Sequence, residues 1–104
     1  MIEPELFDIV ELLIDLPEKV LQAGMQGAIV ECFGSNTFEV EFSNDEGETI
    51  KILPLKSSQF VIVWRSKDNA WIPVTEKVAA LLSVLPGDRQ QQVFEFAKSL
   101  YTKV

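Results

Sequence analysis

The chain has 104 residues, 47% of them hydrophobic and 24% charged, which is the length and composition of one globular domain with a single core. It contains 16 acidic and 9 basic residues, no histidine and one cysteine, Cys32, so an internal disulfide and histidine-dependent metal or catalytic sites are excluded. We therefore predict a protein that is not an enzyme and holds no metal or cofactor.

The first apolar segment, residues 5–16, fits two periodicities. Leu6 and Ile9 belong to a helical stripe, whereas Leu12 and Ile14 belong to one face of a strand. The pattern alone leaves both structures open. We favour a strand, because a small barrel needs a first strand ahead of the hairpins that follow.

The N-terminal segment predicts neither membrane insertion nor secretion. Its most apolar run, residues 9–16, is interrupted by Glu11 and Asp15 and is far shorter than the ~20 residues of a membrane span. The residues before it are acidic, whereas a secretory signal begins with basic residues. We expect a cytoplasmic protein that does not bind membranes.

Three strands joined by two short loops are predicted next, at residues 28–33, 38–42 and 48–53. Charged and apolar residues alternate in the second of them, which is the period of a half-buried strand. Gly24 and Gly27 are expected to form the tight turn that leads into the first of these strands, since glycine adopts positive φ at little cost.

The loop of the first hairpin is centred on Ser35. This register places Glu31 opposite Glu39 and Cys32 opposite Phe38. Cys32 then points into the core, and we expect a buried thiol with a structural role rather than a reactive one.

The loop of the second hairpin is centred on Asp45. This register places Val40 opposite Ile50 and Glu39 opposite Lys51. The outer face of the three strands is then acidic, with Lys51 as its one base. Its acidic residues are Glu31, Glu39 and Glu41.

Charge is unevenly distributed along the chain. Residues 1–73 contain 13 acids and 5 bases, a net charge of -8, whereas residues 74–104 contain 3 acids and 4 bases, a net charge of +1. An acidic sheet repels nucleic acid and attracts basic proteins. We therefore predict that Glu31, Glu39 and Glu41 contribute to binding a basic protein partner and that nucleic acid is not a partner.

A short helical turn at residues 55–59 and a strand at residues 60–64 complete the β-rich part of the chain. Five strands with such a turn before the fifth describe an SH3-like barrel. We predict that this barrel spans residues 1–66.

Motifs spread over residues 5–65 resemble those of a known family. They are Asp8-x-Val10-x-Leu12, Asp15-Leu16-Pro17-Glu18, Gly24-Met25-x-Gly27-x-Ile29-Val30-Glu31, Phe38-Glu39-Val40-Glu41-Phe42, Gly47-x-Thr49, and Leu55 with Gln59. The family is the small bacterial and cyanobacterial domain of unknown function 4926. The resemblance implies an SH3-like β-barrel and no established activity, and some members are associated with toxin–antitoxin loci.

The remaining chain is predicted to form a polar linker at residues 67–74 and a helical hairpin at residues 75–104. Thr75 is a favourable N-cap for the first helix. Pro86 ends that helix, and the second helix starts either with Pro86 in its first turn or with Asp88 as its cap. The complete chain is thus mainly β with C-terminal helices.

The second helix carries more apolar surface than two short helices bury against each other. The residues of this stripe are Val93, Phe94, Phe96, Leu100 and Tyr101. The stripe packs on the barrel, on a second copy of the chain in a homodimer, or on a different partner. Residues 85–100 also resemble short helical segments of antitoxin-like proteins.

Our leading hypothesis is a non-enzymatic interaction module, an antitoxin-like inhibitor that binds a protein partner through this stripe. The alternative is a small structural subunit or assembly factor of a larger enzyme or photosynthetic complex, bound through the acidic barrel face. Trp64 and Trp71 are able to stack on nucleic acid bases. We favour instead their packing between the barrel and the helices, because few basic residues accompany them.

Overall fold

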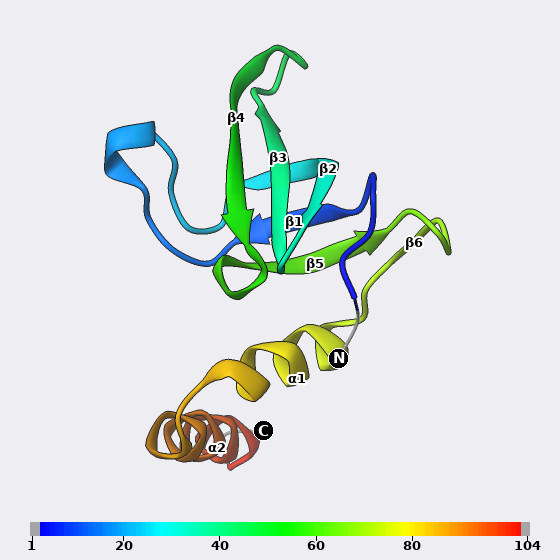
Figure 1. The fold of residues 1–104 in the computed structure, drawn as a ribbon. Coiled ribbons are helices and arrows are strands. Elements are labelled where there is room, and N and C mark those ends of the chain that lie inside the picture. The colour runs from blue at the N-terminus through cyan, green and yellow to red at the C-terminus, as the bar shows by residue number, and fades with distance from the viewer. Residues whose placement is uncertain (1–2, 103–104) are drawn as a thin grey trace.

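A computed structural model describes residues 3–102, which form one open antiparallel sheet and two C-terminal helices (Figure 1). The elements are β1 (Ile9–Leu12), a 3-10 turn (Pro17–Lys19), β2 (Gln26–Gly34), β3 (Thr37–Ser43), β4 (Thr49–Lys56), a second 3-10 turn (Ser57–Gln59), β5 (Phe60–Arg65), β6 (Ala70–Trp71), α1 (Val74–Val84) and α2 (Gly87–Tyr101). The prediction of a mainly β chain with C-terminal helices is confirmed. The predicted strand number is wrong, because Ala70 and Trp71 pair with Arg65 and Trp64 to give a sixth strand within the expected linker.

The strands follow the order β4-β3-β2-β1-β5-β6, and one face of the sheet encloses the core. Strand β3 shows why one face is buried. Its side chains alternate between the two faces of the sheet, so Phe38, Val40 and Phe42 are buried, whereas Glu39 and Glu41 lie on the opposite face. In Figure 1, β1 and β5 run across the direction of β3 and β4, so the sheet curls around these side chains. The core consists of Val10, Leu12, Leu21, Ile29, Phe38, Val40, Phe42, Leu53, Leu55, Phe60, Ile62 and Ile72.

The ambiguous segment at residues 5–16 contains strand β1, so the choice of a strand over a helix is confirmed at Ile9–Leu12. Val10 and Leu12 are buried, as alternation requires of a half-buried strand. Because β1 lies between β2 and β5, it forms hydrogen bonds on both edges and holds the centre of the sheet.

The first hairpin has the predicted register at its loop end. Glu31 lies opposite Glu39, and Cys32 lies opposite Phe38. A bulge at Val30 then shifts the pairing by one residue, so that the buried side chain is Ile29. An unbroken period of two from Cys32 would have turned Val30 to the core, but Val30 is only half-buried.

The second hairpin has a different register from the predicted one. The Asn44 side-chain oxygen accepts the backbone N–H groups of Glu46 and Glu48 at 2.9 Å each, which closes the loop one residue later than expected. Ser43 then lies opposite Thr49, and Phe42 lies opposite Lys51, with Ile50 bulged between them.

This bulge decides which apolar pair of β4 enters the core. Val40 pairs with Leu53, and Leu53 is buried, whereas Ile50 and Ile52 remain exposed. The predicted pair of Glu39 and Lys51 does not form, because Glu39 lies opposite Pro54.

The two glycines before the first hairpin act differently. Gly24 has φ +97 and lies in open space, as expected for a turn. Gly27 does not have positive φ; a Cβ there would lie 2.8 Å from the Glu41 carbonyl oxygen and 2.8 Å from Val40 Cγ1. Gly27 therefore permits the close approach of β2 and β3 rather than a turn.

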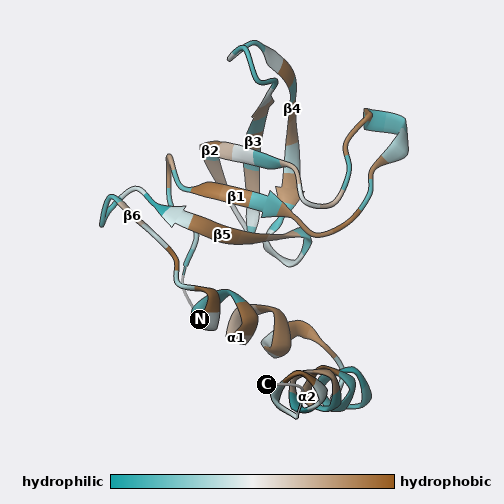
Figure 2. Cartoon of the chain, turned by 180° about the vertical axis from the view of Figure 1, so that it is seen from behind, coloured by the Kyte–Doolittle hydropathy of each residue, from teal (hydrophilic) through white to brown (hydrophobic). Residues whose placement is uncertain are grey.

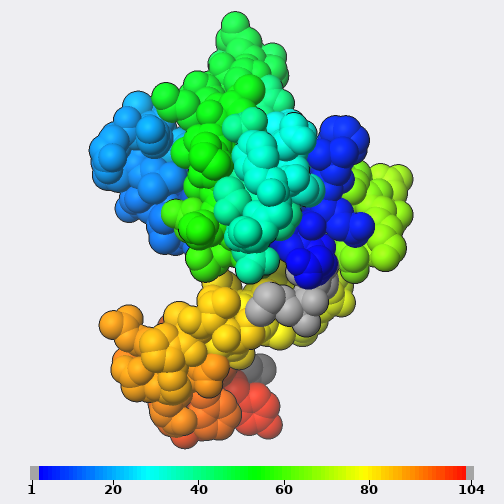
Figure 3. All heavy atoms as spheres, in the orientation of Figure 1, coloured from blue at the N-terminus to red at the C-terminus, as the bar shows by residue number. Residues whose placement is uncertain are grey.

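Helix α1 packs along β5, whereas no element of the described chain packs extensively on α2. The radius of gyration of the Cα atoms is 15.0 Å, above the ~13 Å expected for a compact chain of this length. Figure 3 shows α2, in orange and red, at the end of the molecule opposite the β3–β4 loop. Neither helix of the described chain is long and apolar enough to cross a membrane.

Prolines rather than the predicted caps start both helices. The Pro73 carbonyl accepts the N–H groups of Glu76 and Lys77, and α1 begins at Val74 instead of after Thr75. Pro86 occupies the corresponding position before α2, so neither predicted start of the second helix is correct. The fixed φ of proline suits this position. A backbone N–H here would have no hydrogen-bond partner within the helix, so its absence in proline removes no helical hydrogen bond.

Candidate functional site

The apolar stripe predicted on the second helix lies on α2 and is solvent-exposed. The exposed fractions are 58% for Phe94, 66% for Phe96, 53% for Leu100 and 80% for Tyr101, and Val93 is half-buried. Figure 2 shows apolar and polar sides along α2, with α1 apolar over most of its length. Several large apolar side chains exposed together mark an interaction surface. We call these five residues the α2 face.

Local contacts hold α2 in this exposed position. The Gln90 side chain donates a hydrogen bond of 2.6 Å to the Leu82 carbonyl at the end of α1. Lys98 Nζ lies 5.4 Å above the centre of the Phe94 ring and pairs with Glu95 at 3.2 Å. The Gln90 bond links α2 to the end of α1, whereas the Lys98 contacts lie within α2 and border its apolar side at Phe94.

A groove of about 560 Å³ lies between α1 and the sheet. Its walls are apolar, with Phe60 and Ile62 on β5, Ala80 and Leu81 on α1, and Leu13 after β1. The groove takes no lining residue from α2.

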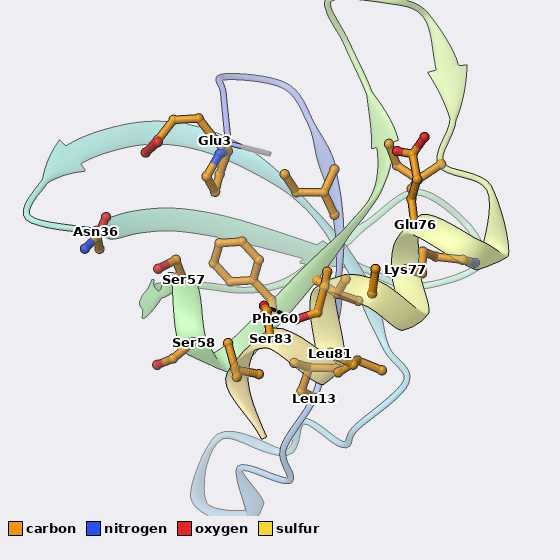
Figure 4. Close-up of a pocket in the computed structure, with 17 residues that line it drawn as sticks. Glu3, Leu13, Asn36, Ser57, Ser58, Phe60, Glu76, Lys77, Leu81 and Ser83 are labelled. Carbon is orange, nitrogen blue, oxygen red and sulfur yellow. Dashed lines mark hydrogen bonds between the residues drawn. The ribbon is translucent and has the colours of Figure 1, made fainter. Parts of the chain in front are cut away.

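The two ends of this groove are polar. Figure 4 shows Asn36, Ser57 and Ser58 at one end and Glu76 and Lys77 at the other, with the Phe60 ring between them. An apolar channel with polar ends has the character of a site for an amphipathic helix or ligand.

The three acidic residues predicted on the sheet lie on adjacent strands. Glu31 and Glu39 are directly opposite each other on β2 and β3. Glu41 lies two residues along β3, where it accepts a hydrogen bond from the Thr49 hydroxyl of β4. Among the described residues, none of the ion pairs involves these three glutamates.

A mainly apolar row that the sequence analysis missed crosses the sheet through one of these acids, Glu41. Direct cross-strand partners share one face of a sheet, and successive partners extend the row from strand to strand. The row runs Ile52, Glu41, Ala28, Ile9, Trp64 and Trp71. Only the registers assemble it, because its members come from six separate strands.

Trp71 ends this row on β6 with 63% of its surface exposed. Trp64, its partner on β5, is half-buried. The expectation that both tryptophans pack between the barrel and the helices is therefore wrong for Trp71, since β6 holds it at the sheet edge.

A model of the family described as domain of unknown function 4926 matches residues 6–62, which is more than half of the chain. The chain belongs to this family. No curated protein and no solved structure matches the chain. In this DUF4926 protein the matched region ends within β5 and leaves α1, α2 and the α2 face outside it.

The single cysteine of the DUF4926 chain is exposed, and the expectation of a buried thiol is wrong. Cys32 lies opposite Phe38 between bulges at Val30 and Phe33, at the loop end of β2, where every residue from Glu31 to Gly34 is exposed. Partial desolvation, and then the negative charges of Glu31, Asp8 and Glu5, raise the pKa of the Cys32 thiol. A raised pKa leaves less thiolate at neutral pH, which opposes a nucleophilic role.

One buried carboxylate of the DUF4926 chain joins the segment before β1 to the residue that follows β5. Asp8 is fully buried and accepts the Glu5 N–H, the Ser66 N–H and the Ser66 hydroxyl at 2.9, 2.9 and 3.0 Å. All its partners are donors that belong to the fold, so Asp8 has a structural role. The described residues contain no group of three or more His, Cys, Asp or Glu side chains placed to hold a metal ion.

Proposed function

We propose that the protein is a non-enzymatic interaction module of the cytoplasm, in which an SH3-like barrel carries α2 as the docking element for a protein partner. In this proposal it acts as an antitoxin-like inhibitor, with the α2 face seated in an apolar groove of the protein that it inhibits. The observation that carries the proposal is the exposure of four large apolar side chains on a helix that does not pack on its own sheet.

The strand order supports the SH3-like barrel. Strand β1 lies between β2 and β5, β2 to β4 follow as a meander, and a 3-10 turn at Ser57–Gln59 separates β4 from β5. The curl of the sheet around one core supports the same fold.

The chemistry of the chain supports binding rather than catalysis. Nucleophilic catalysis commonly pairs a serine or cysteine with a histidine, and the sequence has no histidine. The raised pKa of Cys32 and its acidic neighbours point in the same direction.

The spacing of the apolar residues along α2 supports a helix-in-groove mode of binding. Val93, Phe96, Ala97 and Leu100 stand at positions i, i+3, i+4 and i+7, and they are the anchors of such a helix. Hot spots of interfaces are enriched in large aromatic side chains that fill a pocket. Phe96 is therefore the side chain whose loss should weaken the complex most.

The test is affinity capture from the native host with three baits: the full chain, Phe96→Asp and Gln91→Asp. Both variants add one negative charge to α2, but Gln91 lies on the polar side, where it bonds Glu95 at 2.9 Å. A partner held by the full chain and by Gln91→Asp, and lost from Phe96→Asp, would support the proposal. Equal recovery of every partner on all three baits would refute it.

A second candidate is a small structural subunit or assembly factor that binds a larger complex through the acidic barrel face. Glu31 opposite Glu39 favours it, because two like charges on one face are unfavourable for folding by ~0.2–1 kcal/mol and are relieved by a basic partner. A bait carrying Glu39→Lys and Glu41→Lys tests it. If the subunits of a larger complex are lost from this bait but still captured by Phe96→Asp, the result would favour the assembly factor over the inhibitor.

A further inference from the structure

Two apolar surfaces of this chain lack a partner within the described residues. One is the α2 face, and the other is the groove between α1 and the sheet. The α2 face is convex and built from large side chains. The groove is concave, with the small side chains of Ala79 and Ala80 in its α1 wall.

The connection between the helices keeps α2 out of the groove of its own chain. Leu85 and Pro86 are both extended, with ψ angles of 143° and 159°, and a residue before proline is confined to such conformations. In Figures 1 and 2, α1 runs across the view while α2 is seen along its axis, so α2 leaves α1 crosswise. The bond from Gln90 to the Leu82 carbonyl holds this arrangement.

We infer that the groove receives the α2 face of a second copy, so that two chains exchange α2 reciprocally in a two-fold dimer. The inference rests on the proposed role of α2 as a docking element and names one occupant for its apolar face. The exchange closes on itself because a two-fold axis relates the two chains, so that each fills the groove of the other.

The area available favours exchange over a direct contact between two α2 helices. With ~200 Å² for each aromatic side chain, the exposed parts of Phe94, Phe96 and Tyr101 amount to roughly 400 Å². Two such faces packed on each other bury roughly 800 Å², which is at the level of an incidental contact.

Exchange brings two groove surfaces into the interface as well. The total then reaches roughly 1,300 Å², within the range of specific interfaces. The polar ends of the groove, with Ser57 and Ser58 at one and Lys77 at the other, border the apolar contact as a polar rim.

The dimer also has a consequence for the proposed function. It covers the face that docks on an external partner, so self-association and partner binding exclude each other. The inhibitor would be stored as a dimer and bind its partner as a monomer.

The first test is sedimentation equilibrium of the full chain and three variants. Phe96→Asp places a charge on the α2 face, and Ala80→Trp fills the groove without changing α2. Gln91→Asp is the charge-matched control on the polar side of α2. We expect a dimer for the full chain and the control, and dissociation constants raised about 30-fold or more for the other two. A monomeric full chain, or a dimer that survives Ala80→Trp, would overturn the inference.

The second test is disulfide cross-linking in a Cys32→Ser background. Exchange predicts a covalent dimer when Ala80→Cys and Ala97→Cys are combined, and little product from Ala97→Cys alone. Efficient cross-linking of Ala97→Cys alone would show contact between two α2 helices and would overturn the exchange. A monomer whose partner capture still depends on Phe96 would refute the dimer and leave the proposed function standing.

Discussion

Asp8 and Ser66 lie 58 positions apart, yet the Asp8 carboxylate accepts both the backbone N–H and the hydroxyl of Ser66, at 2.9 and 3.0 Å. The same carboxylate accepts the Glu5 N–H at 2.9 Å. The pair thus ties the segment before β1 to the end of β5 and fixes where the β5–β6 hairpin begins.

Asp8→Ala should lower the free energy of unfolding by about 2–4 kcal/mol. The change leaves the Glu5 and Ser66 N–H groups without their buried acceptor, and each such loss costs ~1–3 kcal/mol. Urea denaturation followed by tryptophan fluorescence measures the effect. Asp15→Ala is the control, because Asp15 accepts one exposed N–H, from Ala23. Equal losses for the two variants would contradict the structural role of Asp8.

Gly27→Ala should destabilise the sheet by about 1–3 kcal/mol, the usual effect of overpacking a core. The added methyl group would meet the Glu41 carbonyl oxygen and Val40 Cγ1, both at 2.8 Å. Gly87→Ala is the matched control, since a Cβ there meets nothing within 4 Å and lies at the start of α2. Thermal unfolding of both variants should show a loss only for Gly27→Ala; an unchanged midpoint would mean that β2 and β3 separate easily.

Glu31→Lys should stabilise the folded chain by a few tenths of a kcal/mol up to about 1 kcal/mol. It replaces a repulsive cross-strand pair with an attractive one, because Glu31 lies directly opposite Glu39. The gain should shrink as salt is raised, since the Debye length falls to ~3 Å at 1 M. Urea midpoints at low and high sodium chloride test this, and a gain that does not depend on salt would rule out the charge explanation.

Alkylation of Cys32 should reach half its maximal rate at a higher pH than alkylation of an unstructured peptide thiol. Desolvation and the charges of Glu31, Asp8 and Glu5 raise the pKa of the thiol, and only the thiolate reacts. Glu31→Gln should move the pH profile toward lower pH by removing one of these charges. Rates of reaction with iodoacetamide across pH give both profiles. A native profile that coincides with the peptide's would show that these neighbours have no effect.

Short-range features of this chain followed from the sequence. The alternation of β3 predicted its buried side chains, and the loop at Ser35 predicted that Glu31 faces Glu39. Both depend on residues close in the chain, where a period of two and a two-residue loop leave few alternatives. The apolar stripe of α2 could be predicted for the same reason, because helical spacing is local.

The bulges and the positions of the elements were decided by the tertiary structure. Ile50 and Ile52 are as apolar as Leu53 and Leu55, and only the bulge at Ile50 selects the leucines for the core. The bulge at Val30 selects Ile29 for the core in the same way, and pairing with β5 makes a strand of two residues in a polar linker. A bulge changes which face a side chain occupies without changing the sequence pattern. The pattern therefore predicted strands β1 to β5, while contacts between distant strands decided which side chains of β2 and β4 are buried and added β6.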